Sequence, residues 1–508
     1  MKPTGFQNRY RAARAMGVFL VCAMVLAACA VGPQFHAPAA PDVALTPNAL
    51  PHATQMADGK AQVFASAGDI SGDWWHLYHS PELNALINAA LANNPTLQAS
   101  QGTLLAAEED FRAGQGALFP SLSGSFQDER QKISAGELAS FGASQGGGKR
   151  GIPPFTLYNA SLNVSYSLDI FGGERRQLES LQAQALYERY ELEAAYLTLT
   201  SNIVTAAVNE ASLRAQIDDT NKVVADEQHE LKILNVQLNL GGTARANVLS
   251  QQAALAQSQA TLPPLQEQLA QLRNQLADYV GIFPGDFHAA DFTLAALHLP
   301  RTIPVSLPSA IVAQRPDIGA AAAQLHEASA NLGVADANML PKITLSAGMG
   351  YEALSTGGLF LPQNMLWSLV AGVTQPIFQG GELAAKRRAA VDNLKVAGAQ
   401  YQGTVIAAFQ NVADALAALQ YDAASLAAAQ AAMDAAAQSL AVTQNAYRLG
   451  AQPFTAVLSA QTSYQNAAIA QVKARAARLA DTAALFQALG GGWWNRNDVA
   501  SRCCGIIP

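Results

Sequence analysis

The chain has 508 residues, of which 50% are apolar and 14% are charged, and its formal net charge at pH 7 is -7. So low a charged fraction excludes an intrinsically disordered chain, and the acidic balance leaves no basic surface to hold nucleic acid. The longest apolar run lies at the N-terminus and covers about 14 residues, whereas a membrane-spanning helix needs about 20. The composition therefore also argues against a helical membrane protein.

The N-terminus has the pattern of an exported lipoprotein. Basic residues between positions 2 and 14 precede an apolar stretch over 15–28, and small residues stand directly before Cys29. This pattern matches the lipobox of bacterial lipoproteins, in which a signal peptide, here 1–28, is removed and the cysteine thiol is acylated. By resemblance to that class, Ala30 implies sorting to the outer membrane. An ordinary signal peptide that happens to contain Cys29 is the alternative.

Two halves of the chain resemble each other, which predicts an internal two-fold repeat. Leu-Phe-Pro-Ser-Leu at 118–122 aligns with Met-Leu-Pro-Lys-Ile at 339–343, and Leu240-Gly241 aligns with Leu449-Gly450. A proline-rich stretch separates the halves and indicates a linker. The expected organisation is a lipid-anchored N-terminal tether at 29–72, a first repeat at 73–283, the linker at 284–308, a second repeat at 309–492 and a C-terminal tail at 493–508.

Within each half the hydrophobic period changes from helix to strand. Residues 82–116 repeat as one helix, and strict alternation then predicts about four strands, near 119–127, 160–170, 341–352 and 366–378. Strands of about 10 residues with one apolar and one polar side suit an outer membrane. A soluble sandwich edge alternates in the same way and is the alternative. Four strands cannot close a barrel, so membrane strands would require a barrel shared between subunits.

A very long helix follows each strand pair, at 174–240 and at 382–449. At about 1.5 Å per residue each would extend about 100 Å. Each is expected to turn at glycine and to return through 248–281 or 454–489. The Pro263-Pro264 pair is expected to break the first return helix. A generic coiled coil is the alternative, but it leaves the interleaved strands unexplained.

Together these features resemble the TolC-like outer-membrane efflux channel family, in its NodT-type lipoprotein branch. The resemblance covers nearly the whole mature chain. It implies an α+β membrane protein: a trimeric, 12-stranded transmembrane β-barrel with four strands per chain, continued by a long periplasmic α-helical barrel. The segments that carry it are Asp73-Trp74-Trp75, Ser80-Pro81-Glu82-Leu83, Ser167-Leu168-Asp169-Ile170-Phe171-Gly172, Gln314-Arg315-Pro316-Asp317-Ile318, Pro376-Ile377-Phe378-Gln379-Gly380-Gly381, Tyr447-Arg448-Leu449-Gly450 and Ala488-Leu489-Gly490-Gly491-Gly492-Trp493.

The function implied by this resemblance is that of a passive conduit. The chain would be the outer-membrane component of a tripartite efflux system that exports small molecules. Its partners would be two further copies, a periplasmic adapter (membrane fusion) protein, an inner-membrane pump and outer-membrane lipid of a Gram-negative bacterium. The pump would be of the resistance-nodulation-division type, with an ABC or major-facilitator exporter as the alternatives. A type I protein-secretion channel and a passive lipoprotein porin are the alternatives.

No catalytic, cofactor or metal site is expected, because the sequence carries no recognised catalytic or nucleotide-binding motif. His76 and His79 stand three residues apart, but a structural role before the first helix is favoured over metal binding. Cys503 and Cys504 are expected to belong to a disordered tail rather than to a metal site.

The resemblance also assigns residues at the periplasmic end. It implies that the tips of the helical hairpins, Gly241, Gly242, Tyr447 and Gly450, contact the adapter. It aligns the constriction with Ala456 and Ser459 after Gly450, and with Asn247 and Ser250 after Gly241. Thr455 stands one turn from Ser459 on the same helix face, so the narrowest rings are expected at Asn247, Ser250, Thr455 and Ser459. Many relatives carry aspartate at such positions, whereas none of these four residues is charged and Arg245 is the only full charge nearby. Asp414, deeper in the long helix, is the alternative source of an acidic ring.

Overall fold

The computed structural model describes residues 30–41, 43, 51–65, 69–132, 153–305 and 308–496. The expected signal peptide, Cys29, Cys503 and Cys504 lie outside these ranges. The chain divides into two compact units. Unit 1 comprises Met1–Ala37, Ala106–Leu186 and Ala323–Ala399, and unit 2 comprises Pro38–Leu105, Tyr187–Ala322 and Gln400–Pro508. Each unit therefore takes segments from both of the expected repeats.

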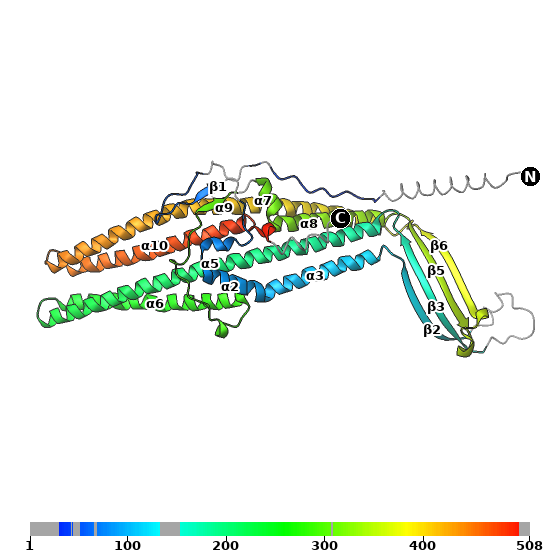
Figure 1. Ribbon diagram of the computed structural model, residues 1–508, viewed down its shortest axis with the longest axis horizontal. Coiled ribbons are helices and arrows are strands. Elements are labelled where there is room, and N and C mark those ends of the chain that lie inside the picture. The colour runs from blue at the N-terminus through cyan, green and yellow to red at the C-terminus, as the bar shows by residue number, and fades with distance from the viewer. Residues whose placement is uncertain are drawn as a thin grey trace, which may run out of the picture. The chain divides into compact units, whose positions relative to one another are not determined.

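Unit 1 contains a four-stranded antiparallel sheet. Its strands are β2 (Ser121–Gln131), β3 (Phe155–Leu168), β5 (Lys342–Ala353) and β6 (Met365–Thr374), and they lie side by side in the order β2-β3-β5-β6 (Figure 1). All four predicted strands are thereby confirmed. β3 begins at Phe155, five residues earlier than predicted, because Phe155-Thr156-Leu157-Tyr158 extends the run of aromatic and branched residues that favour strands.

Unit 2 contains a second, smaller sheet that the sequence did not predict. β1 (Val63–Ala65) pairs in parallel with β4 (Thr302–Pro304), with Phe64 opposite Ile303. Each strand has three residues, which is too short to show an alternating pattern. The pairing joins the expected N-terminal tether to the expected linker, so part of each segment is held against the protein.

The predicted helix at 82–116 is two helices, α2 (Pro81–Asn93) and α3 (Pro95–Gly116). The single-helix prediction was wrong because Pro95 has no N–H and disfavours helical backbone at the residue before it. Asn94 accordingly has an extended ψ of 121°. Its Oδ1 accepts a hydrogen bond from the Leu97 N–H at 2.9 Å, so it caps the start of α3.

The long helices are confirmed, as α5 (Gly173–Asn239), α6 (Arg245–Val280), α9 (Glu382–Arg448) and α10 (Phe454–Ala488). α7 (Pro308–Gln314) and α8 (Pro316–Ala337) precede β5. The prediction that Pro263 and Pro264 break the return helix was wrong, since α6 continues through both. The prolines and residues 259 and 260, whose carbonyls lose their donors, are exposed, so water can hydrogen-bond to those carbonyls.

The core of unit 2 is built around the aromatic residues before α2. A short 3-10 helix, Trp74–Tyr78, buries the Trp74 ring against Phe486 at 5.3 Å, and the Tyr78 hydroxyl donates to the Leu479 carbonyl at 2.8 Å. His79 caps the C-terminal end of this helix with a left-handed φ of 49°, which is a structural role. His76 is exposed. Residues of the expected linker complete the core: Phe287, Phe292, Leu294, Leu297 and Ile303.

Gly281 supplies a test of this packing. It ends α6 with a φ of 80°, and a Cβ added there would lie 2.6 Å from the Asn93 carbonyl oxygen. Gly450 has a φ of 75° but nothing within 4 Å of its added Cβ. Both alanine variants should lose about 1–2 kcal/mol to the left-handed backbone. Gly281→Ala should lose about 1–3 kcal/mol more through crowding. Thermal unfolding of the two variants measures the difference, and equal losses would contradict the contact.

Candidate functional site

The sheet has two chemically different faces. The strand register places alternate residues of all four strands on one side, where they form an apolar face that gives way to Asp128 and Arg130 toward the end of β2. Trp367 and Leu369 on this face are 72% and 73% exposed in the chain. So large an exposed apolar surface indicates contact with lipid or with protein. The apolar face comprises Leu122, Phe126, Leu162, Val164, Tyr166, Leu345, Met349, Tyr351, Trp367, Leu369 and Val373.

The opposite, polar face is lined with hydroxyl and amide groups that bond across the strands. Ser125 Oγ lies 2.9 Å from Ser161 Oγ, and Asn159 Nδ2 donates to Glu352 Oε2 at 3.3 Å. Such a face suits contact with water. The polar face comprises Ser121, Ser123, Ser125, Gln127, Asn159, Ser161, Asn163, Ser165, Thr344, Ser346, Glu352 and Ser368.

The outer strand β6 departs from the alternation that the sequence predicts. Leu366 and Val370 point to the side of the polar face, yet they are 42% and 53% exposed. β6 and β2 are the outer strands of the sheet, and each pairs with one neighbour among the described strands. Each therefore presents a row of unpaired backbone groups, and β6 presents apolar side chains on both sides of that row.

The glycines at the two hairpin turns end their helices in the same way. The Gly241 N–H donates to the Leu238 carbonyl, and the Gly242 N–H donates to the Gln237 carbonyl at 2.7 Å. Gly450 and the residue after it make the corresponding pair of bonds at the end of α9. These are Schellman motifs, which require a left-handed residue, and Gly241 and Gly450 have φ of 76° and 75°. The predicted turns are thereby confirmed.

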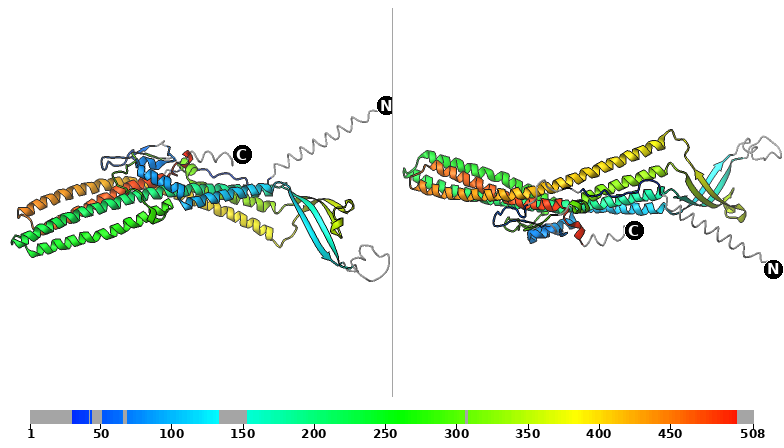
Figure 2. Two further views of the ribbon diagram at one scale, coloured as in Figure 1. Left: turned by 60° about the horizontal axis from the view of Figure 1, so that its bottom comes forward. Right: turned by 90° about the horizontal axis from the view of Figure 1, so that it is seen from above.

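The two hairpins pack together near their turns. Leu234 of α5, Val248 of α6, and Phe454 and Val457 of α10 form one buried cluster. Tyr447 of α9 packs against it, with its ring centroid 5.3 Å from that of Phe454. Figure 2 shows from two sides that the turns after α5 and α9 lie at the same end of unit 2. The expected adapter-contacting residues are therefore brought together within one chain.

The four residues of the expected constriction lie beside this cluster. Thr455 and Ser459 are exposed and stand one turn apart on α10, while Asn247 and Ser250 on α6 are half-buried. The Asn247 side chain donates to Thr243 Oγ1 at 3.0 Å. Asp414, the alternative acidic residue, is exposed on α9 and accepts from Gln410 at 3.3 Å. The role of these residues in a constriction stays a prediction.

One buried carboxyl lies further along α5 from the turn. Gln251 Nε2 donates to the Glu227 backbone carbonyl at 3.0 Å, and the Glu227 side chain hydrogen-bonds Ser258. Burial raises the pKa of Glu227 above the ordinary value for a glutamate. A charged group is therefore disfavoured inside the α5–α6 pair.

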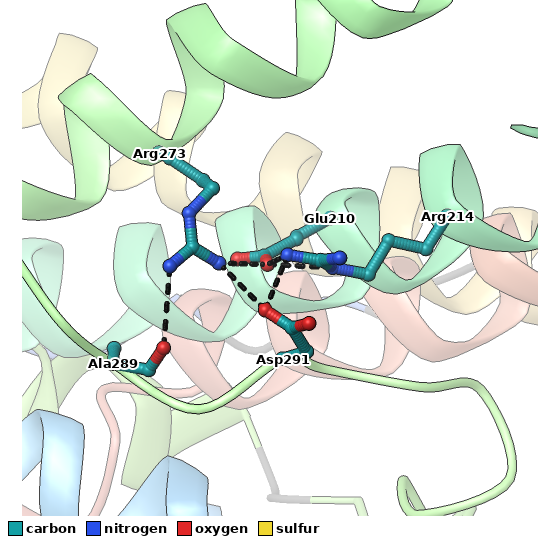
Figure 3. Close-up of polar contacts among 5 residues, drawn as sticks. All are labelled: Glu210, Arg214, Arg273, Ala289 and Asp291. Carbon is teal, nitrogen blue, oxygen red and sulfur yellow. Dashed lines mark hydrogen bonds and ion pairs between the residues drawn. The ribbon is translucent and has the colours of Figure 1, made fainter.

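An ion-pair network fixes the segment that follows α6 (Figure 3). Arg273 of α6 and Arg214 of α5 both lie 2.8 Å from Glu210 Oε1, and the Glu210 side chain is only 1% exposed. Both arginines also pair with Asp291, and Arg273 donates to the Ala289 carbonyl at 3.2 Å. Two cations thus balance two anions, so the buried carboxylate is compensated. The network thus ties the expected linker to α5 and α6 at this point.

The residues that directly follow Cys29 are also held in place. The Val31 N–H donates to the Phe171 carbonyl at 3.0 Å, and Arg176 Nε donates to the Val31 carbonyl at 3.1 Å. Gly32 has a φ of 96°, and a Cβ added there would lie 2.5 Å from the Gly333 Cα. The start of the expected tether is thus docked at the junction of β3 and α5. Sequence reasoning missed Arg176, although an arginine at a buried helical position is itself a signal of a specific partner.

None of the described helices combines the length and the apolar character that a membrane span needs. The described residues also contain no cluster of three or more histidine, cysteine or acidic side chains arranged to hold a metal ion.

A two-faced sheet that continues into long helical hairpins defines an outer-membrane channel protein. The chain belongs to the outer membrane efflux protein family, whose model matches residues 86–282 and 307–491. It is accordingly an outer-membrane efflux channel protein of the kind found in Gram-negative bacteria.

Individual relatives agree with this family. The chain is 29% identical to the pyoverdine export outer membrane protein OpmQ of Pseudomonas aeruginosa, over 84% of this chain and 89% of the relative. It is 26% identical to the probable outer membrane lipoprotein SilC of Salmonella typhimurium, over 92% and 97%. The fold matches the Campylobacter jejuni outer membrane channel CmeC with a TM-score of 0.83, covering 94% of this chain and 98% of that one at 21% identity.

Proposed function

We propose that three copies of the chain close one 12-stranded barrel in the outer membrane, with the apolar face toward lipid and the polar face toward a water-filled lumen. The observation that carries this proposal is the two-faced sheet with an unpaired strand at each edge. In hydrocarbon every backbone polar group needs a partner, so β2 of one copy would pair with β6 of the next. The long helices would continue the barrel as a periplasmic α-helical tunnel.

The same order of elements occurs twice in the chain, which supports the internal duplication. A helix pair, two strands, a long helix and a return helix occur first as α2 to α6 and again as α7 to α10. We infer that 73–283 and 309–492 are the two repeats. In a trimer the two copies of the hairpin would then alternate around the tunnel.

The barrel would act as the passive outer component of a tripartite system that exports small molecules. OpmQ is named for pyoverdine export, which favours a small-molecule cargo over a secreted protein. A periplasmic adapter would contact the hairpin turns at Gly241, Gly242, Tyr447 and Gly450, and an inner-membrane pump of the resistance-nodulation-division type would supply the energy. Cross-linking from the turns in intact cells should capture an adapter. Capture of a secreted polypeptide would favour type I secretion, and capture of neither would favour a passive porin.

The barrel is tested by matched lysine substitutions on adjacent residues of β3. Val164 lies on the apolar face and Ser165 on the polar face. If the apolar face meets hydrocarbon at mid-depth, Val164→Lys should cost about 2–4 kcal/mol, whereas Ser165→Lys should be mild. Trimer yield and the unfolding midpoint in detergent report the difference. Equal tolerance, or a monomer as the native species of the unmodified protein, would reject the shared barrel.

Cys29 is proposed to carry the lipid anchor, as the name of the relative SilC suggests for that protein. Metabolic labelling with a fatty acid should therefore mark the unmodified chain but not Cys29→Ser. Cys503→Ser is the control and should keep the label. Persistent labelling of Cys29→Ser would place the modification elsewhere or remove the assignment.

The lack of a carboxylate at the four expected constriction positions predicts weak cation preference. Rings of Thr455, Ser459, Asn247 and Ser250 offer hydroxyl and amide groups and no carboxylate, so trivalent cations added on the periplasmic side should block the channel little. Bilayer conductance of the purified protein measures this block. The Asp414→Asn variant separates the two sources of charge: strong block that survives in it would contradict this prediction, and strong block that disappears would assign the acidic ring to Asp414.

A further inference from the structure

α9 and α10 each carry one aspartate where the two helices pack against each other. The carboxyl groups of Asp422 on α9 and Asp481 on α10 are within hydrogen-bonding contact. Ionised carboxylates have only acceptor oxygens, so two of them make a hydrogen bond only when one carries a proton. The contact therefore requires one of the two carboxyl groups to be protonated, and this depends on pH.

The nearest cation is already engaged elsewhere. Arg478 of α10 is 2% exposed and makes four hydrogen bonds of 3.2 Å to the N-terminal segment 54–62. Their acceptors are Thr54 Oγ1, Gln62 Oε1 and the carbonyls of Ala57 and Lys60. Asp422 Oδ2 is buried, and no N–H or hydroxyl group of the described residues donates to it. This buried oxygen of the aspartate pair consequently lacks a fixed donor.

The balance of charge around the pair also requires one proton. Tyr78 faces Asp481 as a neutral phenol, because burial raises the pKa of its hydroxyl far above the usual range. If both carboxyls of the pair were ionised, these charged groups would sum to a net charge of -1. One shared proton makes the sum zero, which is favoured where part of the cluster, such as Arg478 and Asp422 Oδ2, is buried. These charged groups are Asp58 of the N-terminal segment, Asp422 of α9, and Arg475, Arg478 and Asp481 of α10.

We propose that a proton shared by Asp422 and Asp481 is a latch that holds α9 against α10, and that its loss toward neutral and alkaline pH loosens this helix pair. α9 and α10 are joined by the turn at Gly450, so the latch would make this helical hairpin most stable at low pH. The latch concerns contacts within one chain and does not depend on the trimer or on the exported molecule.

The direction of the pH dependence follows from proton linkage. Burial, with the contact to Asp481 as the next cause, raises the pKa of Asp422 to about 7, against 3.8 for the free group. The native pair therefore binds more protons than the separated helices between these two values. The shared proton therefore stabilises the helix pair fully below a pH of 3.8. This stabilisation falls as the pH rises and is lost once the pH exceeds about 7.

The test compares the full-length wild-type protein with Asp422→Asn, which keeps the shape of the protonated group and cannot ionise. The two should unfold at similar temperatures near pH 5, and the wild type should become the less stable as the pH rises to about 8. Asp434→Asn is the matched control, because Asp434 is an exposed aspartate of the same helix. It should follow the wild type at every pH. A constant gap between wild type and Asp422→Asn would overturn the proposal.

Hydrogen exchange gives a local readout that a merely destabilised fold would not mimic. After correction for the intrinsic exchange rate, opening of the middle of α9 in the wild type should increase by up to about tenfold per pH unit between about pH 5 and pH 7. Asp422→Asn and Asp481→Asn should each remove this increase, and the double variant should add little. Retention of the pH dependence in both single variants would show that another group carries it.

Discussion

Unpaired backbone groups along β2 and β6 constrain the whole molecule. A single chain has no further long strand among its described residues with which to cover either edge. In water such edges invite aggregation, and in lipid each unpaired group costs several kcal/mol. A neighbouring copy can satisfy both edges at once, because the two outer strands belong to the same sheet.

The sequence predicted the elements whose signals are local. Strand alternation, the absence of proline over 174–240 and 382–449, and glycine after each long helix depend on residues that are close in the chain. The four long strands, the four long helices and both turns are therefore found where they were expected, within a few residues. Pro95 and the Pro263-Pro264 pair show the limit of such rules. Both predictions were made from residue type alone. Whether the helix was interrupted depended instead on whether a capping side chain or water could hydrogen-bond to the backbone groups left without partners.

The contacts that the sequence did not predict join distant parts of the chain. Segments expected to be a tether and a linker contribute to the core of unit 2, and β1 pairs with β4 across nearly half of the sequence. Arg478 is one of several charged residues in the alanine-rich α10, and its partners lie in segment 54–62. Nothing in the local pattern identifies those partners. The candidate tip residues, in contrast, were placed near one another because both hairpins end at recognisable glycines.

Main-chain hydrogen bonds close both hairpin turns, so the side chains of the neighbouring residues are not needed to hold the turns. Each Schellman motif uses main-chain bonds and one glycine, and Ala244, Ala451 and Gln452 are exposed beside it. Substitutions at these three positions would change the surface that the proposed adapter meets at little cost in folding. If the turns contact the adapter as proposed, evolution could alter which adapter such a turn recognises while the helices behind it stay the same. A channel scaffold with these turns is well suited to exchange partners between systems as gene copies diverge.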